Sequence, residues 1–210
     1  MGDPVKRRAT YEDLMAVPDI MIAEIIDGEL VTQPRPASLH AIATSALLGD
    51  LRGPFQRGKG GPGGWIILFE PELHLHGDVL VPDIAGWRRE RMPEAPDAAA
   101  FELAPDWVCE ALSPSNPAHN RVRKMPIYAR DNVAHLWLVD PRGRTLEAYR
   151  RRGAGLSSAP GATTPRCASS RSKPWSSSSG SSGRAELRSI RRRQPVHRHG
   201  IDERASCLRP

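Results

Sequence analysis

The sequence has few cysteines and no long apolar run. Its three cysteines, Cys109, Cys167 and Cys207, stand far apart along 210 residues, which excludes a disulfide framework and a cysteine-based zinc motif. No stretch approaches the roughly 20 apolar residues of a membrane-spanning helix. The charged N-terminal segment is not followed by the hydrophobic region of a signal peptide. We therefore expect a protein of the reducing cytoplasm with no membrane partner.

Aromatic residues are also scarce, and basic residues are unevenly distributed. Three Phe, five Trp and three Tyr are too few and too scattered for a surface that stacks nucleic-acid bases. Residues 1–152 hold 19 Lys and Arg against 21 Asp and Glu, a net charge of −2, whereas residues 153–210 hold 11 against 3, a net of +8. The overall charge of +6 therefore comes from residues 153–210. Residues 1–152 lack the net positive charge that is typical of nucleic-acid binding.

The composition divides the chain into a domain, residues 8–152, and a basic tail, residues 153–210. The tail contains 13 of the 17 serines and no apolar periodicity, which is typical of disorder. One interpretation is a basic arm that binds the DNA backbone. We favour a shifted reading frame: GC-rich codons chosen for the segment from Cys167 to Gly180, read from the third base, encode alternating apolar and acidic residues. On that hypothesis the tail has no evolved function and the domain lacks its last strand.

The predicted elements of the domain follow the order helix, hairpin, helix, several strands, helix, hairpin. The Asp27-Gly28 pair predicts a tight hairpin turn. Apolar spacing predicts a long helix near 38–57, and a second helix within 121–130 that Pro126 delays or kinks. This order predicts an α/β (α+β) fold with a mixed central sheet rather than a doubly wound parallel one.

Three polar residues in apolar surroundings carry the strongest chemical signal. Asp83 lies in the apolar run 78–85, Glu110 in the run 106–112, and Lys124 on the next predicted helix. A carboxylate inside a strand-like run is costly to bury unless a cation or several donors meet it. Two such carboxylates suit a divalent metal, and a nearby lysine can orient water or neutralise an oxyanion. The set is a candidate for metal-dependent phosphodiester hydrolysis, although acids at strand ends are more often solvated edge residues.

Four further polar residues are weaker candidates for a functional site. Glu24 precedes the predicted turn, where a solvated hairpin is the ordinary interpretation. His40 at a helix start can reach a phosphate or water, but histidines there are more often capping or surface groups. His74 and His76 share one face of a predicted strand, a spacing that can bind metal. Without a third ligand we predict that both are structural.

Seven short segments occur in a specific order along the chain. They are Glu24–Leu30, His40, Phe69–Pro71, Val81–Ile84, Ala104–Ser115, Arg123–Arg130 and Leu136–Pro141. In these segments, which span roughly residues 8–150, the chain resembles the bacterial "putative restriction endonuclease" family, long catalogued as a domain of unknown function. That family belongs to the PD-(D/E)XK nuclease superfamily.

The resemblance implies a restriction-endonuclease-like mixed central β-sheet flanked by helices, and an endonuclease that uses Mg²⁺ (or Mn²⁺) to hydrolyse nucleic acid, with DNA as the expected substrate. Asp83 matches the aspartate of the "PD" motif and Glu110 the acid of the second motif. Both would hold the metal together with the backbone carbonyl of Ala111. The superfamily's lysine usually lies two residues after that acid, where this chain has Leu112. Family members carry it on the following helix, which assigns the role to Lys124.

One departure from the family pattern leaves an alternative open. Family members often have an aspartate four residues before the lysine, whereas this chain has Asn120. The alternative hypothesis is a catalytically impaired or decayed nuclease-fold protein without hydrolytic activity. The resemblance also introduces Glu24 as an upstream acid of the site, because the superfamily often adds one. DNA or RNA as target, and a homodimer as the assembly, remain open.

Overall fold

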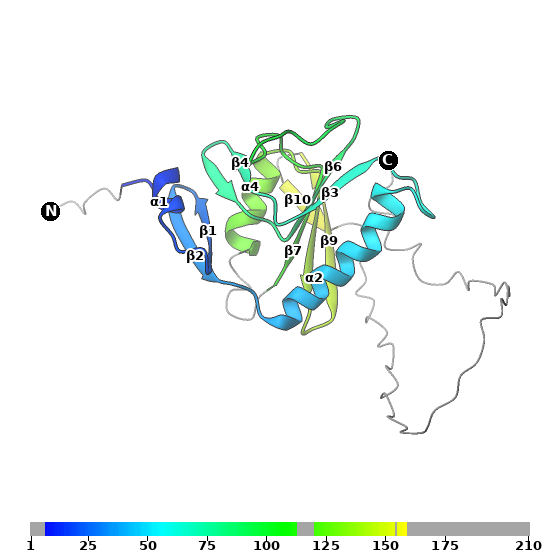
Figure 1. Ribbon diagram of the computed structural model, residues 1–210, viewed down its shortest axis with the longest axis horizontal. Coiled ribbons are helices and arrows are strands. Elements are labelled where there is room, and N and C mark those ends of the chain that lie inside the picture. The colour runs from blue at the N-terminus through cyan, green and yellow to red at the C-terminus, as the bar shows by residue number, and fades with distance from the viewer. Residues whose placement is uncertain (1–6, 113–119, 154, 159–210) are drawn as a thin grey trace, which may run out of the picture. The chain divides into compact units, whose positions relative to one another are not determined.

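The computed structural model describes residues 7–112, 120–153 and 155–158 (Figure 1). In chain order the first elements are α1 (Tyr11–Met15), β1 (Met21–Ile26), β2 (Glu29–Pro34), α2 (Ser38–Leu51), the π-helical turn η1 (Arg52–Gln56), β3 (Trp65–Phe69), β4 (Leu73–Leu75) and β5 (Asp78–Leu80). They are followed by β6 (Ile84–Arg88), β7 (Trp107–Ala111), the π-helical turn η2 (Asn120–Lys124), α4 (Met125–Arg130), β8 (His135–Asp140), β9 (Thr145–Arg152) and β10 (Gly155–Ser158). Both interpretations of the tail concern residues that lie almost entirely outside this part of the chain.

The larger sheet has six strands in the order β10-β9-β8-β7-β6-β3. β7 and β8 run parallel, whereas the other neighbouring pairs of this sheet are antiparallel. Figure 1 shows α2 and α4 on opposite sides of this sheet. The predicted mixed sheet flanked by helices near 38–57 and 121–130 is therefore confirmed.

A second, four-stranded sheet has the order β2-β1-β5-β4, which the sequence did not predict as a separate layer. Its hairpin turns at Asp27 and Gly28, whose φ angles are 55° and 78°. Two successive positive φ angles define the type I′ turn that suits a two-residue hairpin. The predicted turn is therefore confirmed, and it ends β1 two residues after Glu24.

The apolar run 78–85 is divided between the two sheets, although its pattern predicts one continuous strand. β5 belongs to the four-stranded sheet and β6 to the six-stranded sheet. Pro82 lies between them and has no backbone N–H to donate to a ladder. The chain therefore leaves one sheet at Leu80 and enters the other at Ile84, and Asp83 lies at this crossing.

The register of β6 and β7 brings the two predicted metal-binding acids to neighbouring strand ends. Ile84 pairs with Cys109 in this antiparallel ladder, so the next position along each strand sets Asp83 opposite Glu110. Directly opposed residues of an antiparallel pair have their Cβ atoms about 4.5–5.5 Å apart. The predicted adjacency of the two strand ends is confirmed.

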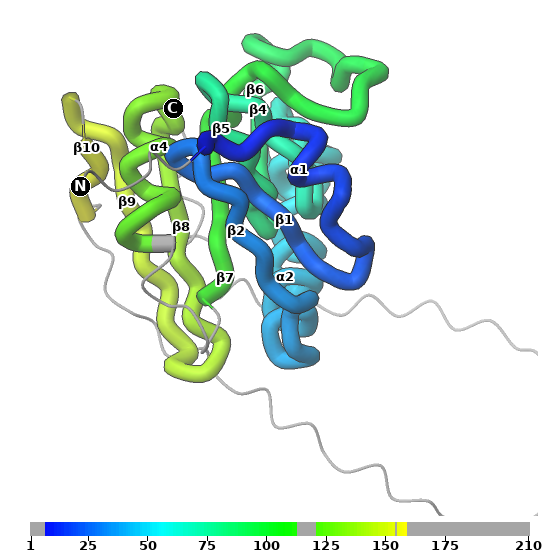
Figure 2. Tube along the Cα trace, turned by 90° about the vertical axis from the view of Figure 1, so that its left-hand side faces the viewer, coloured from blue at the N-terminus to red at the C-terminus, as the bar shows by residue number. Residues whose placement is uncertain are grey.

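The larger sheet continues past the domain boundary predicted at Arg152. β10 pairs antiparallel with β9, with Gly155 opposite Arg152 and Ser158 opposite Tyr149. Figure 2 shows this strand at the outer edge of the sheet, beside β9. Gly155–Ser158 thus forms backbone pairs that its serine-rich sequence did not suggest.

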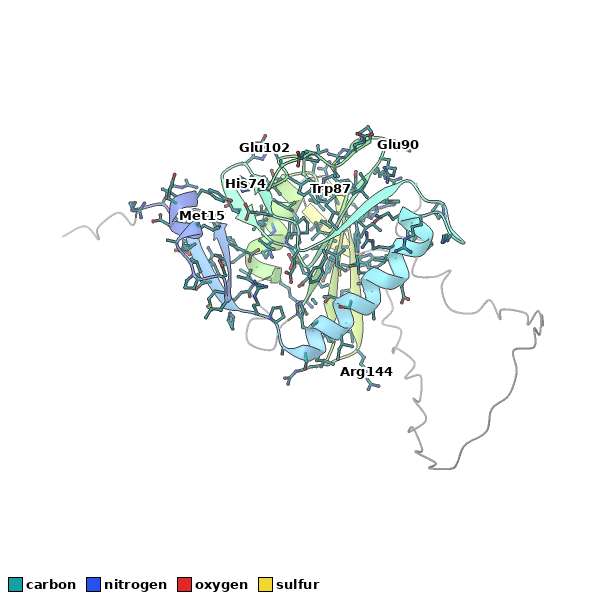
Figure 3. The ribbon with its side chains drawn as sticks, in the orientation of Figure 1. Met15, His74, Trp87, Glu90, Glu102 and Arg144 are labelled. Carbon is teal, nitrogen blue, oxygen red and sulfur yellow. The ribbon has the colours of Figure 1, made fainter. Side chains whose placement is uncertain are left out.

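The main core fills the space between the sheets and α4. Its largest buried side chains include Trp87, whose Nε1 donates to the carbonyl of Leu103 at 2.8 Å. Figure 3 shows Trp87 in the interior and, by contrast, Glu90 at the periphery. Met92 and Phe101 anchor the polar segment 88–105 in this core. Among the described residues, no helix has the length and apolar character that crossing a membrane requires.

Candidate active site

Asp83, immediately before β6, is held by contacts to two other elements. Its Oδ2 accepts a hydrogen bond from the backbone N–H of Ala111, at the end of β7, at 2.6 Å. Its Oδ1 lies 2.6 Å from Nε2 of His40. The side chain is largely buried, and these two contacts fix the orientation of its carboxylate.

His40 lies in the first turn of α2, and the structure places it in the site rather than at the surface. Its side chain is mostly buried, and its Nδ1 is a buried nitrogen with no hydrogen-bond partner among the described residues. Burial alone would lower the pKa of His40, but the hydrogen bond and charge of Asp83 outweigh it and the pKa is raised. The helix thus supplies a cationic or donor group to Asp83.

Lys124 joins Glu110 and Glu24 in a buried ion-pair network. Its Nζ lies 2.7 Å from Oε1 of Glu110 and 2.8 Å from Oε1 of Glu24. Lys124 is 1% exposed, Glu24 1% and Glu110 3%. The last residue of η2 thereby connects β7 of the larger sheet to β1 of the smaller one.

The same network holds the chain where it crosses between the sheets. The backbone N–H of Val81 donates to Oε1 of Glu24 at 2.8 Å, and Nζ of Lys124 makes a longer contact of 3.5 Å to the Val81 carbonyl. Val81 precedes Asp83 by two residues. Glu24 and Lys124 therefore stabilise the backbone that positions Asp83, which gives Glu24 a structural connection to the site.

Burial and neighbouring charges shift the pKa values of Glu110 and Lys124. Burial raises the pKa of Glu110 to about 7, and the charges of Asp83 and Glu24 act in the same direction, while Lys124 opposes them. Burial would lower the pKa of Lys124, but Glu110 and Glu24 outweigh it, so the lysine stays charged. Lys124 thus pairs with Glu24 and Glu110, and His40 with Asp83; a divalent cation held by Asp83 and Glu110 would favour the charged form of Glu110.

Two residues beside the site were not predicted from the sequence. The hydroxyl of Tyr128, on α4, donates to Oε1 of Glu110 at 2.6 Å. Glu70, just after β3, has a φ of 44°, and its N–H donates to the carbonyl of Asp83 at 3.1 Å. Burial raises the pKa of Glu70, and the charge of Asp83 adds to the effect. Tyr128 follows Lys124 by one helical turn, a spacing that could have indicated a shared face.

The two predicted histidines, His74 and His76, have partners outside this cluster. His74 lies 2.7 Å from Glu72, and His76, which has a φ of 50° and lies beyond the end of β4, pairs with Asp131. Both histidines therefore have acidic partners of their own, consistent with structural roles. Asn120 begins η2, but its side chain lies outside the part of the chain that the structure describes.

The donor set fits a hard cation with few protein ligands. Within the described ranges, no group of three or more His, Cys, Asp or Glu side chains could hold a metal ion. Mg²⁺ is usually bound by one or two carboxylates together with waters and substrate phosphates. The described contacts of Glu110 with Lys124 and Tyr128 both use Oε1, so Oε2 can coordinate a cation without breaking either. Asp83, Glu110 and the carbonyl of Ala111 therefore suit Mg²⁺ or Mn²⁺.

The fold and the site together define a mixed-sheet domain with two acids at adjacent strand ends and a lysine on the following helix. The Uma2 family, described as "Putative restriction endonuclease", matches residues 8–169. The chain belongs to this family, as its motifs predicted.

A solved structure shows a similar fold. The crystal structure of a "putative nuclease belonging to DUF820" from Anabaena variabilis superposes with a TM-score of 0.60 at 21% sequence identity. The alignment covers 71% of this chain and 83% of that chain. No curated protein matches the chain. At this identity the likeness supports the fold alone.

Proposed function

We propose that the protein is a Mg²⁺-dependent endonuclease that hydrolyses phosphodiester bonds, with DNA as its substrate. One observation carries the proposal: three elements that are distant in sequence bring Asp83, Glu110 and Lys124 into one buried cluster. Membership of a restriction-endonuclease family supports the same reaction class. Mn²⁺ is expected to substitute for Mg²⁺, and the cytoplasmic location stays a prediction.

Asp83 and Glu110 would hold the cation, aided by the carbonyl of Ala111. When bound, the cation would lower the pKa of a coordinated water and stabilise charge on the phosphoryl oxygens. Lys124 has three N–H donors. Within the described residues two meet Glu110 and Glu24, and the third makes the 3.5 Å contact to Val81. That third donor is the group we expect to orient the attacking water.

The alternative is a nuclease-fold protein without hydrolytic activity. It is favoured by Asn120, which stands where family members often carry an aspartate, and by the absence of a net positive charge over residues 1–152. The retained Asp83, Glu110 and Lys124 argue against it, because a decayed site has no reason to keep three buried charged groups together at a cost in desolvation.

The full-length protein is expected to nick supercoiled plasmid DNA with Mg²⁺ and to lose this activity with EDTA. Supercoiled plasmid converts to the open-circle form after a single cut, so agarose gels detect even slow cleavage. A labelled RNA of the same sequence, incubated in parallel, separates DNA from RNA specificity. Cleavage that persists in EDTA, or no cleavage of either substrate with Mg²⁺ or Mn²⁺, would contradict the proposed function.

A further inference from the structure

Tyr128 makes a contact to the site that the proposed mechanism does not use. Its hydroxyl donates to Oε1 of Glu110 at 2.6 Å, and its side chain is 0% exposed. Tyr128 lies on α4 four residues after Lys124, so both side chains lie on one face of the helical segment. The helix thereby brings two donors to the same carboxylate oxygen.

The hydroxyl is unusual for its surroundings. The ring of Tyr128 packs in the main core with residues such as Val108, Leu136 and Leu138, where a phenylalanine would fill nearly the same volume. Burying a hydroxyl is costly unless it is hydrogen-bonded, and its described partner is the Glu110 carboxylate. The ring serves packing, whereas the hydroxyl acts on Glu110.

We propose that Tyr128 is a positioning residue that orients Glu110 for the cation; the inference rests on the proposed function. With Lys124 and Tyr128 both bound to Oε1, rotation of the carboxylate is restricted and Oε2 is the oxygen presented to the metal. Groups that hydrogen-bond to a metal ligand fix its orientation, and their loss typically reduces metal affinity or activity about 10–100-fold.

The test is Mn²⁺ binding by the full-length protein, measured by titration calorimetry without nucleic acid. Tyr128→Phe removes the hydroxyl and keeps the ring, and it is expected to weaken Mn²⁺ binding by about 10-fold. Tyr149→Phe is the matched control, because the Tyr149 hydroxyl donates to Oε2 of Glu147 at the same 2.6 Å. Glu147 lies on β9, two strands from Glu110, so the control should bind Mn²⁺ like the wild type.

The outcomes separate positioning from a purely structural role. Thermal unfolding of the metal-free proteins reports stability, and a structural hydroxyl would lower the melting temperature of Tyr128→Phe while leaving its Mn²⁺ affinity unchanged. Equal Mn²⁺ affinity in wild type and Tyr128→Phe would therefore overturn the proposal and leave the proposed function standing. A Tyr128→Phe protein that does not fold would assign the hydroxyl to stability and also overturn it. A wild-type protein that binds no Mn²⁺ would overturn both.

Discussion

Replacing Asp83 by asparagine is expected to reduce Mg²⁺-dependent nicking by more than about 100-fold. Loss of a group that only hydrogen-bonds to a metal ligand already reduces metal affinity or activity by about 10–100-fold. The substitution keeps the size of the side chain and one acceptor oxygen for the N–H of Ala111. It replaces the oxygen that faces His40 by an NH2 group and removes the negative charge that a hard cation requires. Glu110→Gln should have the same effect. Initial nicking rates over a series of Mg²⁺ concentrations measure both.

Matched controls exclude a general effect of losing a carboxylate. Asp97→Asn and Glu90→Gln make the same chemical changes at exposed positions of the segment between β6 and β7, and Figure 3 shows Glu90 at the periphery. Both controls should cleave like the wild type. Wild-type rates in Asp83→Asn would remove Asp83 from the mechanism.

Replacing Lys124 by methionine is expected to lower the free energy of unfolding at neutral pH by about 3–5 kcal/mol, the usual cost of removing one partner of a buried ion pair. Methionine keeps much of the side-chain volume but leaves Glu24 and Glu110 without their common cation. Urea unfolding followed by circular dichroism measures the change.

A second substitution tests whether the loss of the Lys124 charge causes the loss of stability. Lys124→Met combined with Glu24→Gln removes one of the two carboxylates that Lys124 binds, so the double variant should be more stable than Lys124→Met alone. Lys59→Met, at an exposed position, should change the free energy of unfolding by no more than about 0.5 kcal/mol. A loss of less than about 1 kcal/mol in Lys124→Met, well below the usual cost, would show that the network contributes little.

Local patterns predicted the individual elements well because their causes are local. The Asp27-Gly28 turn follows from residues that tolerate positive φ, and the late start of α4 follows from Pro126, which lies in its first turn. The position of Glu110 within a buried strand was readable from the apolar residues around it. These signals depend on a few neighbouring residues and need no knowledge of the tertiary structure.

The division of 78–85 between two sheets was not predicted, because an apolar run shows burial but not which ladder each residue joins. Pro82 was the available signal, since it interrupts that run. The contacts of His40 with Asp83 and of Tyr128 with Glu110 join residues 43 and 18 positions apart. They depend on how α2 and α4 pack on the sheet, and a tyrosine in an apolar helix is by itself an ordinary core residue.

Asp83 and Glu110 are expected to bind one cation between them. The most direct measurement is the anomalous difference density of a crystal of the full-length protein soaked in Mn²⁺. We expect one strong peak within about 2.0–2.3 Å of an oxygen of each carboxylate, close to the distance for octahedral oxygen coordination. A well-ordered site without a peak, or a peak that contacts neither carboxylate, would contradict it.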